Sequence, residues 1–173
     1  MKVTVADCLE LDAFAKAKVV AAKVNLTNEV KSISVLDASS EDELCFYEGD
    51  KTEILLTGFA GVQEDADAQC RILHHIATRG YAALAVYHSG GLSPKLIEAA
   101  EREMMPLIQM PKDAGYSRAI SEVMDRVLYG DNFRNTLISN TVFHLLNFEK
   151  HSNFQSAVRE AAINNDFQLI IAT

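Results

Sequence analysis

The sequence predicts an α/β fold, with a small parallel or mixed sheet built from βα crossovers and followed by a helical segment. From residue 54 onward, short apolar runs alternate with amphipathic segments, and loops containing glycine follow the first two runs. Residues 117–148, in contrast, show almost no strand signal. Alternation of short strands with helices of 12–16 residues is typical of a parallel sheet.

The N-terminal segment predicts one helix and a pair of strands. Thr4 and Asp7 have the spacing of a capping box, in which two side chains satisfy the first N–H groups of a helix. The runs over residues 19–24 and 31–36 have strand character. Because the Asn and Thr residues in 25–28 suit a turn, we expect the two strands to pair as a hairpin.

A strand–loop–helix pattern then repeats. Gly80 is placed to end one helix, and Ser93 followed by Pro94 is placed to begin the next. The expected elements are strands over residues 54–57, 82–86 and 106–111 and helices over residues 64–79 and 93–105.

Beyond this pattern the chain is expected to be helical and then to enter another domain. We expect an α/β domain over residues 1–115, a helical connector over 116–149, and the start of a truncated further domain over 150–173. The apolar stripes of the connector either pack back on the sheet or pair with a second copy of the chain. The residues expected to form a dimer interface are Phe133, Leu137, Ile138 and Leu145.

Composition and charge exclude some classes of partner. The 16 Lys and Arg against 24 Asp and Glu give a net charge of −8, which opposes binding to nucleic acid or to an anionic membrane. No apolar run reaches the roughly 20 residues of a membrane span, and the N-terminus lacks the apolar region of a signal peptide. We therefore expect a cytoplasmic protein that does not bind DNA through this part of the chain.

Two loops form the candidate ligand site. Each follows a predicted parallel strand and precedes a helix, where backbone N–H groups can hold an anion or a carbonyl. Neighbouring loops of this kind form one crevice, although glycines in such loops also serve simply to let the chain turn. The candidate residues are Thr57, Gly58 and Gly61 in the first loop and His88, Ser89, Gly90, Gly91 and Ser93 in the second.

Catalytic and cofactor motifs are missing from the sequence. Neither GxGxxG nor GxxxxGK[ST] occurs, and Ser89 does not lie in a GxSxG sequence. Cys8, Cys45 and Cys70 are too far apart in sequence for a zinc motif and are interpreted as reduced thiols. We expect no catalytic residues, no cofactor and no metal.

The ordered series of segments resembles the N-terminal domain of PucR-type purine-catabolism transcriptional regulators. The resemblance covers about residues 3–130. It rests on residues 4–9, 19–21, 25–30, 53–58, 80–84 and 106–111, together with Val35 and Asp37. The chain departs from the family pattern over residues 48–53, where the usual Gly-Gly-Glu is replaced, and it has Thr57 alone where the family has two threonines.

The resemblance implies a non-enzymatic domain that senses a small metabolite, with purine-derived compounds among the candidates. It also implies a homodimer, and a helix-turn-helix domain outside this chain. Three alternatives stay open. The chain could be a dimerisation module without a ligand, an enzyme acting through His88 and Ser89, or an accessory domain of a metabolic kinase or acyltransferase. The last follows from a more distant similarity to accessory domains of bacterial HPr kinase/phosphorylase and some phosphotransacetylases.

Overall fold

The computed structural model describes residues 2–36, 51–88, 90–111 and 113–130. Within them, the predicted α/β class is confirmed by a five-stranded sheet of order β1-β5-β4-β3-β2. Its strands are β1 (Lys18–Ala21), β2 (Ser32–Val35), β3 (Glu53–Thr57), β4 (Ala83–Val86) and β5 (Leu107–Gln109). The α-helices are α1 (Val5–Leu9), α3 (Ala66–Arg79), α4 (Pro94–Arg102) and a helix over residues 116–130, and the 3₁₀ helices are η1 (Asp12–Phe14) and η2 (Lys23–Asn25).

Several predictions fall outside the described residues. They concern Ser89, Cys45 and the four residues of the expected dimer interface, Phe133, Leu137, Ile138 and Leu145. The connector beyond residue 130 and the expected further domain over 150–173 also lie outside.

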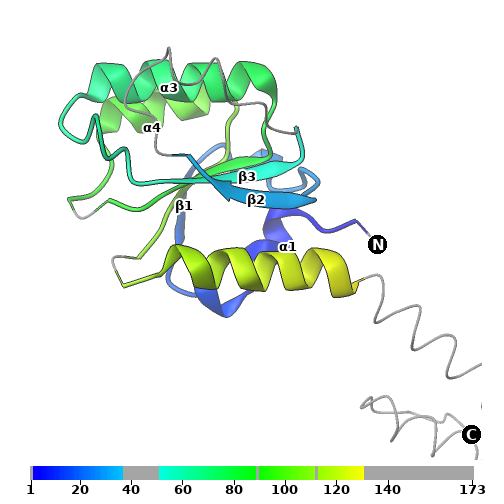
Figure 1. The fold of residues 1–173 in the computed structure, drawn as a ribbon. Helices are drawn as coiled ribbons and strands as arrows, with labels where there is room; N and C mark the ends of the chain where they lie inside the picture. The colour runs from blue at the N-terminus through cyan, green and yellow to red at the C-terminus, as the bar shows by residue number, and fades with distance from the viewer. Residues whose placement is uncertain (1, 37–50, 89, 112, 131–173) are drawn as a thin grey trace, which may run out of the picture. The chain divides into compact units, whose positions relative to one another are not determined.

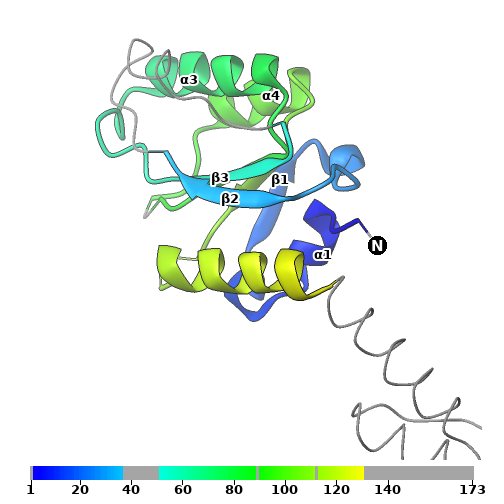
Figure 2. The ribbon, with the colours of Figure 1, turned by 45° about the vertical axis from the view of Figure 1, so that its right-hand side comes forward.

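Helices cover both faces of the sheet (Figures 1 and 2). On one side α3 and α4 lie next to each other, and on the other side lie α1 and the helix that begins at residue 116. Leu55 and Leu84 point into the buried cluster that contains residues of α3 and α4. Their neighbours Ile54 and Ala83 point into the second cluster, which contains residues of α1 and of the 116–130 helix. The core therefore consists of two apolar layers separated by one sheet.

Strands β2, β3, β4 and β5 are parallel, whereas β1 is antiparallel to β5 at the edge. Thr57 is aligned with Val86, and Val86 with Gln109, so β3, β4 and β5 end at the same edge of the sheet. Because β1 runs the other way, Lys18 at its start is aligned with Gln109 at the end of β5.

The predicted hairpin between the first two strands is wrong, because β1 and β2 lie at opposite edges of the sheet. The residues that suggested a turn make other contacts. The Asn28 side-chain amide donates to the Ala82 carbonyl at 3.0 Å, and the Asn28 carbonyl accepts from the Val5 N–H at 3.0 Å. The first strand is also shorter than expected, since Ala22 adopts a left-handed φ of 52° and begins η2.

The helix ends follow the sequence signals. Thr4 and Asp7 form the capping box of α1, Gly80 ends α3 with φ 79°, and the Ser93 hydroxyl caps α4 with Pro94 in its first turn. These side chains satisfy backbone N–H groups that a helix leaves without partners.

We expect Thr4→Ala to lower the free energy of unfolding by about 1 kcal/mol. The Thr4 Oγ1 accepts from the Asp7 N–H at 3.3 Å, and Asp7 Oδ2 accepts from the Thr4 N–H at 2.8 Å. Urea denaturation of Thr4→Ala and of Thr27→Ala, which changes an exposed threonine, gives the comparison. Equal stability of the two variants would show that the box contributes nothing.

Candidate functional site

The loops after β3 and β4 begin side by side at the carboxyl edge of the sheet. The Tyr87 N–H donates to the Thr57 carbonyl at 2.8 Å, directly beyond the last aligned pair of the two strands. The Met110 N–H donates to the Val86 carbonyl at 2.9 Å, so the segment after β5 starts at the same edge. Three loops therefore share this edge, which is where ligands bind in open α/β sheets.

The loop after β3 holds a strained residue. Phe59 is buried and has φ 50°, a left-handed conformation that bulky residues rarely adopt. Its N–H donates to the Thr57 Oγ1 at 3.0 Å, and its carbonyl accepts from the Val62 N–H at 2.8 Å. The buried Thr57 hydroxyl thus fixes the shape of the loop. Strain of this kind is concentrated at functional sites.

The loop after β4 brings His88 and Gly90 together. The Gly90 N–H donates to His88 Nδ1 at 3.1 Å, so the histidine ring folds back on the backbone of its own loop. Gly91 has φ 89°, which favours glycine. The Ser93 Oγ accepts from the Leu96 N–H at 3.2 Å, which gives this candidate ligand residue a capping role.

Two tyrosines join these loops to the helix over residues 116–130. The rings of Tyr87 and Tyr116 lie 4.3 Å apart between centroids. A Cβ added at Gly58 would lie 3.0 Å from the Tyr116 hydroxyl, so glycine permits this close approach. The start of the helix is therefore in contact with the loop after β3 and with the residue that follows β4.

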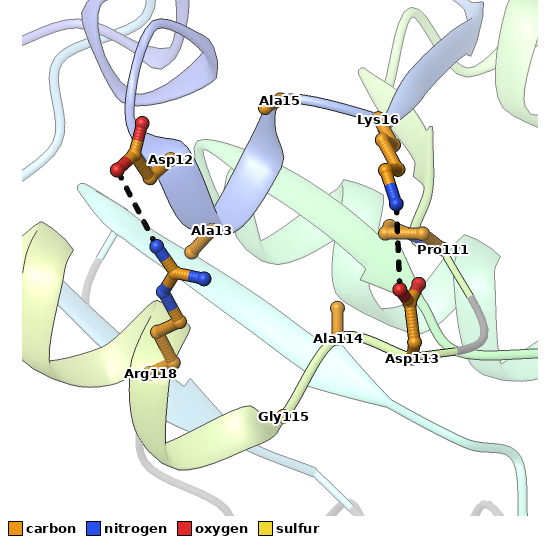
Figure 3. A pocket seen from close by; sticks show the side chains of 9 residues that line it. All are labelled: Asp12, Ala13, Ala15, Lys16, Pro111, Asp113, Ala114, Gly115 and Arg118. Carbon is orange, nitrogen blue, oxygen red and sulfur yellow. Dashed lines mark hydrogen bonds and ion pairs between the residues drawn. The ribbon is translucent and has the colours of Figure 1, made fainter.

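The structure also contains a pocket of about 130 Å³ beside the end of β5 (Figure 3). It is lined by Asp12, Ala13, Ala15, Lys16, Pro111, Asp113, Ala114, Gly115 and Arg118. Arg118 Nη2 lies 3.4 Å from Asp12 Oδ2, and Lys16 Nζ lies 3.5 Å from Asp113 Oδ2. These two ion pairs stand on opposite sides of the pocket.

Glu122 connects η1, which lines one side of the pocket, to the helix over residues 116–130. Its carboxylate accepts from the Ala13 N–H at 2.7 Å and from Arg118 Nε at 2.7 Å. Burial of the carboxyl raises the pKa of Glu122, but these two donors outweigh burial and hold the pKa below its ordinary value. The ionised carboxylate therefore connects η1 to the first turns of the helix at neutral pH.

The described cysteines, Cys8 and Cys70, are both free thiols. Burial raises the pKa of Cys8 to about 12, and it also raises the pKa of Cys70. In the described part of the chain no three His, Cys, Asp or Glu side chains gather as metal ligands do. None of the helices found there combines the length and apolarity that crossing a membrane requires.

Sequence reasoning anticipated two of the three loops at this edge. It missed the segment over residues 111–116, although the predicted strand over 106–111 implied a third loop at the same place. The contribution of residues 12–16 to the pocket had no sequence signal, because it depends on the antiparallel pairing of β1 with β5.

Comparisons with known proteins identify one family. The model of the purine catabolism regulatory protein-like family, PucR, matches residues 7–127. No curated protein matches the chain. Among solved structures, the chain is similar to the CBS and DRTGG domains of the regulatory region of Clostridium perfringens pyrophosphatase, crystallised with the activator diadenosine tetraphosphate. The identity is 16% and the TM-score 0.48, over 71% of this chain and 49% of that one, so this chain spans about half the length of that structure.

We expect Tyr87→Phe to raise the free energy of unfolding by about 1 kcal/mol at neutral pH. The Tyr87 hydroxyl oxygen is buried and has no hydrogen-bond partner within the part of the chain that the structure describes. Urea denaturation measures the change, with Tyr116→Phe as the comparison. A marked loss of stability would instead indicate that the hydroxyl is satisfied in the folded protein.

The pH dependence of the free energy of unfolding gives a second test of Tyr87→Phe. Burial and the neighbouring Tyr116 raise the pKa of Tyr87 from 10.0 to about 12. A phenol with a raised pKa contributes stability that is complete below the unfolded pKa and is lost as the pH rises through the folded one. The wild-type protein should therefore lose more stability than Tyr87→Phe between pH 10 and about 12.

Proposed function

Because this chain belongs to the purine catabolism regulatory protein-like family, we propose that it is a non-enzymatic regulatory domain that senses a small metabolite. The proposed site is the crevice between residues 57–61 and 88–93. The observation that carries the proposal is the common edge at which the two loops begin, joined by the hydrogen bond from Tyr87 to Thr57. Purine-derived compounds are the first candidates for the ligand.

The strain at Phe59 supports a functional role for the first loop. A left-handed conformation costs free energy and persists only where the surroundings impose it. The Phe59 side chain is buried in the core cluster that contains residues of α3 and α4, and this packing holds the backbone in that conformation. The loop therefore keeps one shape at the edge where the ligand is proposed to bind.

We propose that the helix over residues 116–130 carries the signal. Tyr116 lies against Gly58 and Tyr87, so a ligand that shifts either loop also shifts the start of this helix. A ligand can change the equilibrium between two arrangements only through its different affinity for them. In this proposal a DNA-binding domain elsewhere in the protein responds to the change.

A thermal-shift screen tests the ligand proposal. We expect a compound among purine-catabolic intermediates, amino acids and short acyl phosphates to raise the melting temperature. At 100 times its Kd, a ligand that binds only the native state adds about 2.7 kcal/mol to the free energy of unfolding. No shift for any compound, with a folded protein, would contradict metabolite sensing by this domain.

Two glycine variants then locate the site. In Gly90→Val the new Cβ would meet only the His88 ring, at ordinary contact distance, so the fold should survive while the crevice is filled. Gly58→Val presses on the Tyr116 hydroxyl as well. We expect both to weaken the ligand found in the screen by at least tenfold and Gly130→Ala, with open space around its Cβ, to leave its Kd unchanged. Unchanged affinity in both valine variants would place the ligand elsewhere.

We also propose that the regulator is a homodimer assembled through the connector. Leu128 and Tyr129, in the last described turn of the helix, are exposed. The apolar pattern continues beyond them to Phe133, Leu137, Ile138 and Leu145. An apolar stripe of this length on a helix needs a covering surface, and in this proposal a second copy of the chain supplies it.

Analytical ultracentrifugation tests this assembly. We expect a concentration-dependent dimer for the whole chain and a monomer for the double variant Leu137→Asp and Leu145→Asp. Val24→Asp, which charges an exposed apolar residue in η2, is the control and should remain dimeric. A wild-type chain that is monomeric at every concentration would refute the dimer.

A further inference from the structure

We propose that the pocket between η1 and residues 111–118 binds a small zwitterion, a molecule of the amino-acid class with one carboxylate and one ammonium group. The pocket shares no residue with the loops over 57–61 and 88–93, so this is a second site beyond the one proposed above. The proposal rests on the size of the pocket, on the two ion pairs that flank it, and on the position of Arg118.

The size of the pocket suits a small molecule. Its volume is about 130 Å³, and a cavity of about 150 Å³ accommodates a single six-membered ring. The rest of the lining includes short side chains, with Ala13, Ala15 and Ala114 between the two sides and Pro111 beside the Lys16–Asp113 pair. The long charged side chains stand at the two sides, which leaves the space between them open (Figure 3).

Both ion pairs can open at little cost. Their N–O distances of 3.4 and 3.5 Å are long for charge-assisted contacts, and exposed pairs of this kind contribute little to stability. Arg118 is the less exposed partner of its pair, at 60% against 85% for Asp12, whereas Lys16 and Asp113 are almost equally exposed, at 76% and 74%.

The orientation of the ligand follows from which charge is held in place. Glu122 holds Arg118 through Nε, and Arg118 Nη2 reaches to Asp12 on the pocket side. Arg118 also lies in the first turn of its helix, where the dipole opposes a cation and favours an anion. The ligand carboxylate therefore binds Arg118 in place of Asp12, which returns to water.

The ammonium group of the ligand then faces Asp113 on the opposite side of the pocket and replaces Lys16 there. Arg118 and Asp113 remain paired, each with one end of the ligand, while Asp12 and Lys16 become hydrated. A simple anion would form an ion pair with Arg118 but none with Asp113. A simple cation would form an ion pair with Asp113 but none with Arg118. Charge complementarity therefore selects a molecule with both groups.

Isothermal titration calorimetry with the whole chain tests this site. The probes are glycine, β-alanine and γ-aminobutyrate, in which the charges lie progressively further apart, with acetate and methylammonium as single-charge controls. We expect saturable binding of at least one zwitterion and at least tenfold weaker binding of both controls. Failure of all three zwitterions to bind at millimolar concentration, or equal binding of acetate, would overturn the proposal.

Four variants of the pocket residues test the orientation of the ligand, because two of them should weaken zwitterion binding and two should strengthen it. We expect Arg118→Gln and Asp113→Asn each to weaken the zwitterion roughly tenfold. Asp12→Asn and Lys16→Gln should tighten it a few-fold, because each removes a competitor of the ligand. Lys2→Gln, which removes an exposed ion pair with Glu29 outside the pocket, should leave the Kd unchanged. Weakening by all four pocket variants alike would contradict the assigned orientation.

Arg118→Gln also removes a contact of Glu122, so the stability of that variant is measured beside its affinity. Asp113→Asn does not touch Glu122 and keeps the test valid if Arg118→Gln unfolds. Failure of this site is distinguishable from failure of the proposed function. Binding that depends on Gly90 but not on Arg118 would leave the crevice proposal intact and overturn this one.

Discussion

Burial of the central strands on both faces is the constraint on which the rest of this structure depends. Leu55 and Leu84 enter one apolar cluster and Ile54 and Ala83 the other, so each face of β3 and β4 needs a covering layer. Helices that follow one strand and precede the next supply α3 and α4 on one face, and the connections they make keep the strands parallel. Parallel strands end at the same edge. The loops after β3, β4 and β5 therefore lie together because of the layered core, whatever residues the loops themselves contain.

The helix over residues 116–130 links this edge to the rest of the fold. Its buried Ala119 and Val123 belong to the second apolar cluster, while Tyr116 lies against Gly58 and Tyr87. Two turns into the helix, Glu122 holds both η1 and Arg118. A helix that contributes to the core and also contacts every loop of the candidate edge is suited to transmit changes there. Membership of a regulatory family is consistent with such a role.

Local signals predicted the elements well and their long-range pairing poorly. The sequence alone predicts the capping box at Thr4, the helix end at Gly80 and the Ser93 cap, because each depends on residues close in sequence. The hairpin failed because strand pairing is decided by the whole sheet, and β1 finds its partner in β5, far along the chain. The same long-range pairing brings residues 12–16 to the pocket. Strain at Phe59 and the contact between Gly58 and Tyr116 depend on tertiary packing and leave no pattern in the sequence.

Amide hydrogen exchange of the whole chain, with and without a ligand that raises the melting temperature, measures whether a ligand at the carboxyl edge of the sheet is coupled to the helix that begins at residue 116. With such coupling we expect slower exchange in the loops after β3 and β4 and, in the same sample, over the first turns of that helix. Slower exchange confined to other elements, or loop protection with no change in the helix at saturating ligand, would contradict it.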